Sequence, residues 1–288
     1  MSRPLAELLP GSAGGGSIRV WLKSSAYTSR LLLGEAGDPW VSAAHYLAYF
    51  SQAHGLLKPD VAVLEVGELY DAWAARHGGL VVAPGSRRRP ATALRRLLEP
   101  AGPKELLAEV VGAVLAHLRG QAPLVLAMPS PKCWLGIANR MTGRLDIEAT
   151  GDDIEDAAMY VADLLRAVSA FEVSGLLLEE DPDDAAFSGE DLARYQSVVN
   201  VVRHYRWSVA LRLPAGSVLQ AEALNDLDAV ISPRVDHAGG AAVGRDISMA
   251  FAAGQRIPPL AERQFHFAQI QPGLRPESVL EAMSQLRA

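Results

Sequence analysis

The chain has 288 residues, of which 49% are hydrophobic and 21% charged, so it can bury a sizeable core and is too long for most small binding modules. Its net charge of −6 argues against a nucleic-acid or anionic-membrane surface, because phosphate groups are bound through clustered lysine and arginine. The single cysteine, Cys133, excludes an internal disulfide and a cysteine-pair zinc site. No apolar run approaches the roughly 20 residues of a membrane span. We therefore expect a cytoplasmic protein with a small-molecule partner.

Residues 1–16 are rich in glycine and serine, which predicts a flexible N-terminal lead-in. Apolar runs that end in polar or turn residues then alternate with helix-like segments, as buried parallel strands do. The clearest helical pattern covers residues 151–172, where apolar residues recur every three or four positions and Asp152 with Glu155 suggests a capping box. The predicted strands begin at Ser17, Val61, Leu80, Pro123, Ser174, Ser208, Asp228 and Asp246.

Strands that alternate with helices in this number predict an α/β fold, a (β/α)8 TIM barrel formed as a single domain by residues 17–288. The main rival is an open doubly wound sheet. Against it, no G-x-G-x-x-G turn opens a helix, and the sequence GSAGGGS precedes the first predicted strand instead of following it.

Two stretches suggest a family. The segment LKPDVAVLEVGELYDAWAARHGGLVVAPGS resembles uroporphyrinogen decarboxylase-like proteins, in which a strand ends at a polar position, a short helix follows, and a glycine precedes the next strand. The segment APLVLAMPSPKCWLGIANRMTG is similar to the next landmark of that family, a strand that ends in a proline-containing loop. The resemblance implies a barrel of the type shared with cobalamin-independent methionine synthase and corrinoid methyltransferases, and it implies a homodimer.

The departures from this family concern the chemistry. Its zinc-dependent methyltransferases carry a His-x-Cys pair after the sixth strand, where this chain has Arg212 and Pro214, so no metal is expected. Its decarboxylases use an arginine-rich loop, a strand-end aspartate and a C-terminal histidine. Here Lys23 and Arg30 lack the arginine spacing, Glu65 or Glu68 lies near the acidic position, and His266 is slightly out of register.

Active sites of such barrels lie at the carboxyl ends of the strands, so polar side chains there are the candidates. Carboxylates mixed with lysine and arginine can hold an anionic substrate and move a proton without a cofactor. The predicted catalytic residues are Glu65, Glu68, Glu179 and His237, and the predicted substrate-binding residues are Lys23, Arg87, Lys132, Asp181 and Arg212.

Plainer explanations exist for several of these residues. Arg212 could instead form a buried ion pair with Glu179 or Glu65, since an unpaired buried charge is costly. The run Glu179–Asp184 has the composition of a solvated loop, and Arg87 opens an arginine run that favours a surface patch.

Three functions follow from these patterns. The favoured one is a metal-free, decarboxylase-like lyase acting on a carboxylated small molecule at the barrel mouth. The second is a methyltransferase of the methionine synthase or corrinoid type with an atypical or absent zinc site. The third is a barrel without catalysis that serves binding or partner interaction.

Overall fold

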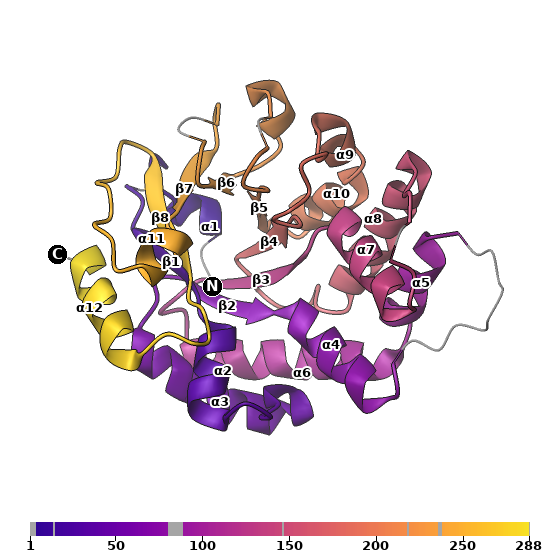
Figure 1. The fold of residues 1–288 in the computed structure, drawn as a ribbon, viewed down its shortest axis with the longest axis horizontal. Helices are drawn as coiled ribbons and strands as arrows, with labels where there is room; N and C mark the ends of the chain where they lie inside the picture. The colour runs from indigo at the N-terminus through magenta and orange to yellow at the C-terminus, as the bar shows by residue number, and fades with distance from the viewer. Residues whose placement is uncertain are drawn as a thin grey trace.

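The computed structural model describes residues 4–13, 15–79, 89–145, 147–217, 219–235 and 238–287. Its centre is a parallel sheet curled into a barrel, in the strand order β1-β8-β7-β6-β5-β4-β3-β2 (Figure 1). This is the (β/α)8 arrangement predicted from the sequence. The strands are β1 (Val20–Lys23), β2 (Ala62–Glu65), β3 (Leu124–Pro129), β4 (Gly175–Glu179), β5 (Ser208–Arg212), β6 (Ala229–Ser232), β7 (Ala242–Asp246) and β8 (Gln264–Gln269).

Helices surround most of the barrel, and their apolar faces pack against the outer faces of the strands (Figure 1). None of the described helices combines the length and apolar composition needed to cross a membrane. The longer helices are α2 (Ser25–Leu33), α3 (Ala43–Leu57), α4 (Val66–Arg76), α5 (Ala91–Leu98), α6 (Ala101–Leu118), α7 (Pro131–Met141), α8 (Gly151–Arg166), α10 (Gln196–His204) and α12 (Pro276–Arg287). The short ones are α1 (Leu5–Leu8), α9 (Gly189–Ala193), α11 (Ser248–Ala252), and the 3-10 turns η1 (Pro39–Val41) and η2 (Ala221–Leu224).

Helix α8 is the strongly periodic segment of the sequence, and its start shows how local chemistry sets a boundary. Thr150 is the N-cap, and its side chain accepts a hydrogen bond from the Asp153 backbone amide, while the Asp153 carboxylate accepts one from the Thr150 amide. A capping box is therefore present, but Thr150 and Asp153 form it instead of the predicted Asp152 and Glu155.

The last strand differs from the prediction. The strand predicted to begin at Asp246 is wrong, because Asp246 ends β7 and the following residues form α11. The eighth strand is β8, which the sequence pattern missed because polar residues, including Gln264 and His266, interrupt its apolar run while being buried. The predicted strand that begins at Leu80 lies outside the described residues.

The amino-terminal end of the barrel is closed by α1, in a segment predicted to be a flexible lead-in. The Leu5 amide donates to the Ser174 carbonyl at 3.1 Å, and the Ala6 amide donates to the Ser208 hydroxyl at 2.8 Å. The Leu5 side chain is fully buried among the residues that fill the barrel. Apolar packing therefore outweighs the local glycine content here.

Aromatic rings fill the middle of the barrel above this floor. Trp21 stacks on Phe265 at a centroid distance of 5.9 Å and meets the edge of Phe267 at 6.2 Å. A Cβ on Gly244 would lie 2.6 Å from the Ile231 side chain, so this position has room only for glycine. The interior is a packed core, which leaves the carboxyl ends of the strands as the place for a site.

Strands β1 and β2 are the two ends of the sheet order, and no ladder joins them within the described sheet. We call this junction the seam. Asp60 covers part of the exposed β1 edge, because its Oδ2 accepts hydrogen bonds from the backbone amides of Arg19 and Val20, both at 2.9 Å. A side chain thus supplies the acceptor that a neighbouring strand would otherwise provide.

Candidate active site

Successive side chains of a strand point to opposite faces, so every second residue faces the barrel interior. Lys23 follows the interior residue Trp21 by two positions, Glu179 follows Leu177, and the other strand ends repeat this spacing. The result is a ring of polar groups directly above the apolar core. The polar ring consists of Lys23, Glu65, Glu179, Arg212, Asp246 and Gln269.

One half of the polar ring is centred on Lys23. Its Nζ lies 3.1 Å from Glu65 Oε2 and also donates a hydrogen bond to Glu179 Oε2. Glu179 then connects the two halves, because its Oε1 lies 3.3 Å from Arg212 Nη1. Lys23 therefore shares its charge between two carboxylates and is largely enclosed, with 14% of its side chain exposed.

The other half is centred on Arg212. Its Nε and Nη2 donate to Asp246 Oδ2 at 2.9 and 2.8 Å, and its Nη1 also donates to Gln269 Oε1. The guanidinium carbon lies 5.0 Å from the centroid of the Phe267 ring. The sequence left open whether Arg212 binds a substrate or forms a buried ion pair with Glu179 or Glu65. In the structure it is ion-paired with Glu179 and Asp246.

Asp246 is itself held in place. Its Oδ1 accepts hydrogen bonds from the Ser248 amide at 3.0 Å and the Ser248 hydroxyl at 2.5 Å. The Ser248 hydroxyl in turn accepts a hydrogen bond from the backbone amide of Gln269 at 2.8 Å. These bonds hold the carboxylate that orients Arg212.

Glu65 is the least satisfied member of the ring. Only 5% of the residue is exposed, and its Oε1 has no hydrogen-bond partner among the described residues. Burial raises the pKa of Glu65 to about 8; Lys23 opposes this rise, while Glu179 and Glu68 add to it. For Lys23, burial alone would lower the pKa, but the attraction of Glu65 and Glu179 outweighs it and raises the pKa, so Lys23 stays charged.

Glu68 lies one helical turn beyond Glu65, near the start of α4. The Ser25 hydroxyl donates a hydrogen bond to its Oε1 at 2.5 Å. Burial raises the pKa of Glu68, and the bond from Ser25 opposes that rise. Glu65, Glu68 and Glu179, which were predicted from the sequence, therefore come together around Lys23.

A cavity of about 180 Å³ opens beside this cluster. Such a volume is many times the ~10–15 Å³ that one water molecule needs on the same measure, so a small organic molecule fits. The cavity is lined by Lys23, Ser25, Ala26, Glu65, Gly67, Glu68, Asp71, Met128, Pro129, Glu179, Gln269 and Ile270.

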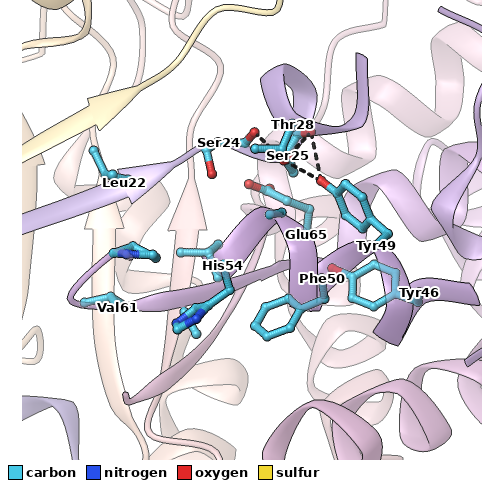
Figure 2. A pocket seen from close by; sticks show the side chains of 14 residues that line it. Leu22, Ser24, Ser25, Thr28, Tyr46, Tyr49, Phe50, His54, Val61 and Glu65 are labelled. Atoms are coloured by element: carbon cyan, nitrogen blue, oxygen red, sulfur yellow. Dashed lines mark hydrogen bonds between the residues drawn. The ribbon is translucent and has the colours of Figure 1, made fainter. Parts of the chain in front are cut away.

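A second cavity of about 40 Å³ lies at the seam, and Glu65 and Ser25 line both. Figure 2 shows Glu65 between the Ser24–Ser25 turn and the aromatic side chains of α3. The Tyr49 hydroxyl donates to the Ser25 carbonyl at 3.1 Å and lies 2.7 Å from Thr28 Oγ1. This network holds the turn that carries Ser25.

Two predicted binding residues lie elsewhere in the structure. Lys132 forms ion pairs with Asp184 at 2.7 Å and Asp191 at 3.0 Å, and Asp181 lies 4.0 Å from Arg140. Neither lines the cavity. Lys132 lies beyond the last inward residue of β3, Pro129, in the first turn of α7, and Asp181 lies beyond the last inward residue of β4, Glu179. Arg87 and His237 lie outside the described residues.

Glu180 and Cys133 also lie beyond strand ends, but Glu180 is buried, Cys133 is partly buried, and neither lines the cavity. Glu180 accepts hydrogen bonds from the Ser130 hydroxyl at 2.7 Å and the Tyr195 hydroxyl at 2.8 Å, and burial raises its pKa to about 7. Burial also raises the pKa of Cys133 to about 12, which keeps that thiol protonated near neutral pH.

Asp246 and Gln269 were missed by the sequence reasoning. Both are the last inward residues of their strands, but the strand predicted from Asp246 begins where β7 ends, and no strand was predicted at β8. Extending the alternation along GAAVGRD and QFHFAQ would have found them, since each follows an interior residue by two positions.

The side chains of the site determine whether it could hold a metal ion. Within the described part of the chain, no three His, Cys, Asp or Glu side chains gather in a way that could hold a metal ion. Arg212, which stands where the resemblance places a zinc ligand, is bound to carboxylates. The described residues therefore do not fit the zinc centre of the methyltransferases that the sequence resembles.

Comparison with solved structures establishes the architecture. A methyltransferase from Methanosarcina mazei superposes with a TM-score of 0.63 at 9% sequence identity, covering 99% of this chain and 98% of that chain. The chain has the (β/α)8 barrel fold. No family model and no curated protein sequence matches it. The shared barrel agrees with the fold that the sequence resemblance implied.

Proposed function

We propose that this protein is a methyltransferase that moves a methyl group from a small-molecule donor to a thiol, with Glu65 as the general base. Glu65 would take the proton of the thiol. The sulfur electron pair would then form the new bond to the methyl carbon, and the donor–methyl bond would break with its electron pair leaving on the donor. Both molecules would occupy the cavity beside Lys23.

The state of Glu65 is the observation that carries this proposal. Its pKa of about 8 is close to the ~8.5 of an unperturbed thiol, so proton transfer between the two groups is nearly balanced in free energy. Its Oε2 is held by Lys23, and its Oε1 has no partner among the described residues. A base of this kind would do the work that zinc does when it lowers the pKa of a bound thiol, in a site whose described residues do not fit zinc.

The fold comparison adds support, because the neighbour that covers the whole chain is named as a methyltransferase. The lyase favoured by the sequence remains a prediction with less support. It requires a cation that is free to hold a substrate carboxylate, and the predicted binding cations that the structure describes, Lys23, Lys132 and Arg212, are already paired with protein carboxylates.

Methyl transfer can be tested with donors whose methyl groups carry ¹³C. The purified chain is mixed with a thiol and a panel of sulfonium, quaternary ammonium and methyl ether donors, and S-methyl product is followed by NMR. We expect product formation whose rate rises with pH up to about 8, as Glu65 loses its proton. In Glu65→Gln the rate should fall by roughly 100-fold or more, in line with the loss of a general base.

Glu180→Gln is the matched control, because Glu180 is also a buried glutamate with a raised pKa but does not line the cavity. Its rate should equal that of the wild type. An unchanged rate in Glu65→Gln, or no S-methyl product from the whole panel, would contradict the proposal. Release of carbon dioxide from carboxylated compounds, abolished by Glu65→Gln, would instead establish the lyase.

A further inference from the structure

We infer that the small molecule bound in the 180 Å³ cavity is a methylated cation, a quaternary ammonium or a sulfonium, whose charge is met by Glu65 and Glu68. As the methyl donor, this ligand rests on the proposed methyl transfer; as a bound ligand, it rests on the cavity alone. The inference reverses the sign of the substrate charge predicted from the sequence.

The cavity wall is acidic. One basic residue, Lys23, and four acidic residues line it, namely Glu65, Glu68, Asp71 and Glu179. Lys23 is engaged by two of these carboxylates, and Arg212 behind it is engaged by Glu179 and Asp246. An anion would therefore meet uncompensated negative charge, whereas a cation would reduce the repulsion among the carboxylates.

A second observation points to a missing partner in the cavity. Glu65 is 95% buried, given its 5% exposure, yet its Oε1 has no hydrogen-bond partner among the described residues. Leaving a buried carboxylate oxygen unpaired is unfavourable unless something else compensates the charge. Oε1 is itself buried and an onium group has no N–H donor, so a cation in the cavity that Glu65 lines would compensate the charge of the carboxylate without a hydrogen bond to Oε1.

The remaining wall explains why the cation should be methylated. Ala26, Met128, Pro129 and Ile270 add apolar surface to the charged lining of the cavity. A primary ammonium has three N–H donors that all need acceptors, whereas an onium group has none. An onium group needs only negative charge and an apolar surface for its methyl groups, and this cavity offers both.

Cation binding should be linked to proton release. A positive ligand next to Glu65 favours its ionised form and so lowers its pKa from about 8. The affinity for a cation therefore rises with pH and levels off above about 8, while the affinity for an anion would fall over the same range. The titratable or charged groups around Glu65 are Lys23 of β1, Glu68 of α4, Glu179 of β4, and Tyr46, Tyr49 and His54 of α3.

The test is calorimetric titration of the full chain with tetramethylammonium and trimethylsulfonium chlorides. Repeating it in buffers of different ionisation enthalpy at pH 7 counts the protons released. Two compounds of similar shape serve as comparators, the neutral 2-methylpropan-2-ol and the anion pivalate. We expect the two cations to bind with proton release, and their affinity to rise roughly tenfold from pH 6.5 to 8. The two comparators should bind at least tenfold more weakly.

Variants tie the binding to Glu65. Glu65→Gln keeps the shape of the side chain and removes its charge, so cation affinity should fall at least tenfold and lose its pH dependence. Glu180→Gln should bind as the wild type does. Far-UV circular dichroism of each variant checks that the fold is retained.

Several results would overturn the inference. These are tighter binding of pivalate with proton uptake, equal binding of the neutral alcohol, binding of Mg²⁺ or Ca²⁺ in place of the onium ions, or unchanged binding in Glu65→Gln. The two proposals fail separately. Cation binding with proton release but no S-methyl product rejects methyl transfer alone, whereas S-methyl product from an uncharged donor without cation binding rejects this inference alone.

Discussion

Replacing Glu65 by glutamine should make the protein more stable above neutral pH. The pKa of Glu65 is raised from an ordinary value of 4.5 to about 8 in the folded chain. Between these values the folded protein keeps a proton that the unfolded chain has released, so this group makes stability fall as pH rises from about 4.5 to about 8. Glutamine does not titrate, so the variant should lack this part of the pH dependence.

The size of the effect follows from the same two values. Each pKa unit corresponds to about 1.4 kcal/mol, so the rise from 4.5 to about 8 lowers the unfolding free energy at high pH by at most roughly 5 kcal/mol. Water that enters the cavity weakens the burial penalty, and we expect Glu65→Gln to gain about 2–4 kcal/mol of unfolding free energy at pH 8.5 and almost nothing at pH 5. Gain of stability with loss of activity is the pattern expected where a site holds an unfavourable charge for function.

Urea unfolding followed by circular dichroism, at intervals from pH 5 to 8.5, measures this difference. Glu99→Gln is the control, because the Glu99 side chain is 63% exposed and, among the described residues, forms an ion pair only with Arg95 one helical turn away. Its effect should stay within about 0.5 kcal/mol. If Glu65→Gln loses stability at pH 8.5, Glu65 is ionised and its ion pair with Lys23 stabilises the fold, and the reasoning above is wrong.

Two further predictions concern the polar ring and the seam. Arg212→Met leaves the Asp246 carboxylate without its cation and Glu179 with Lys23 alone, so it should cost about 3–5 kcal/mol of unfolding free energy. Adding Asp246→Asn should restore part of that loss. A loss below about 1 kcal/mol would mean that the Asp246 carboxylate is solvated. Asp60→Ala removes the acceptor of the backbone amides of Arg19 and Val20 at the β1 edge. It should cost about 1–2 kcal/mol of unfolding free energy and speed hydrogen exchange at the Val20 amide. Unchanged exchange at Val20 would show that Asp60 does not protect this edge.

The fold could be predicted because its signal is local and repeated. A short apolar run bounded by turn residues, such as that of β3, favours an interior strand, and the spacing of apolar residues along α8 favours a helix. Strand β8 was missed because His266 and Gln264 are buried polar residues. His266 Nε2 lies 3.0 Å from the Pro258 carbonyl, a contact with a loop that no residue pattern encodes.

The site could be predicted in part for a similar reason. Lys23, Glu65, Glu179 and Arg212 end strands that were placed correctly, and the inward alternation then brings them together. What the sequence could not provide was the pairing. Whether Arg212 faces a ligand or Asp246 depends on the register between β5 and its neighbours around the barrel, and that register follows from three-dimensional packing.

The seam separates Lys23 of β1 from Glu65 of β2, and no hydrogen bond of the described sheet fixes the distance between them. Lys23 and Glu65 belong to strands that share no ladder, so what fills the gap between β1 and β2 sets their separation, and Tyr46, Tyr49 and Phe50 of α3 line that gap. Glu179 and Arg212, by contrast, are register partners on the adjacent, hydrogen-bonded strands β4 and β5, so their separation is fixed by the sheet. Substitutions in α3 can therefore retune the acid–base pair without breaking a sheet hydrogen bond. This makes the seam the natural place for the site to acquire new substrates, in evolution or by design.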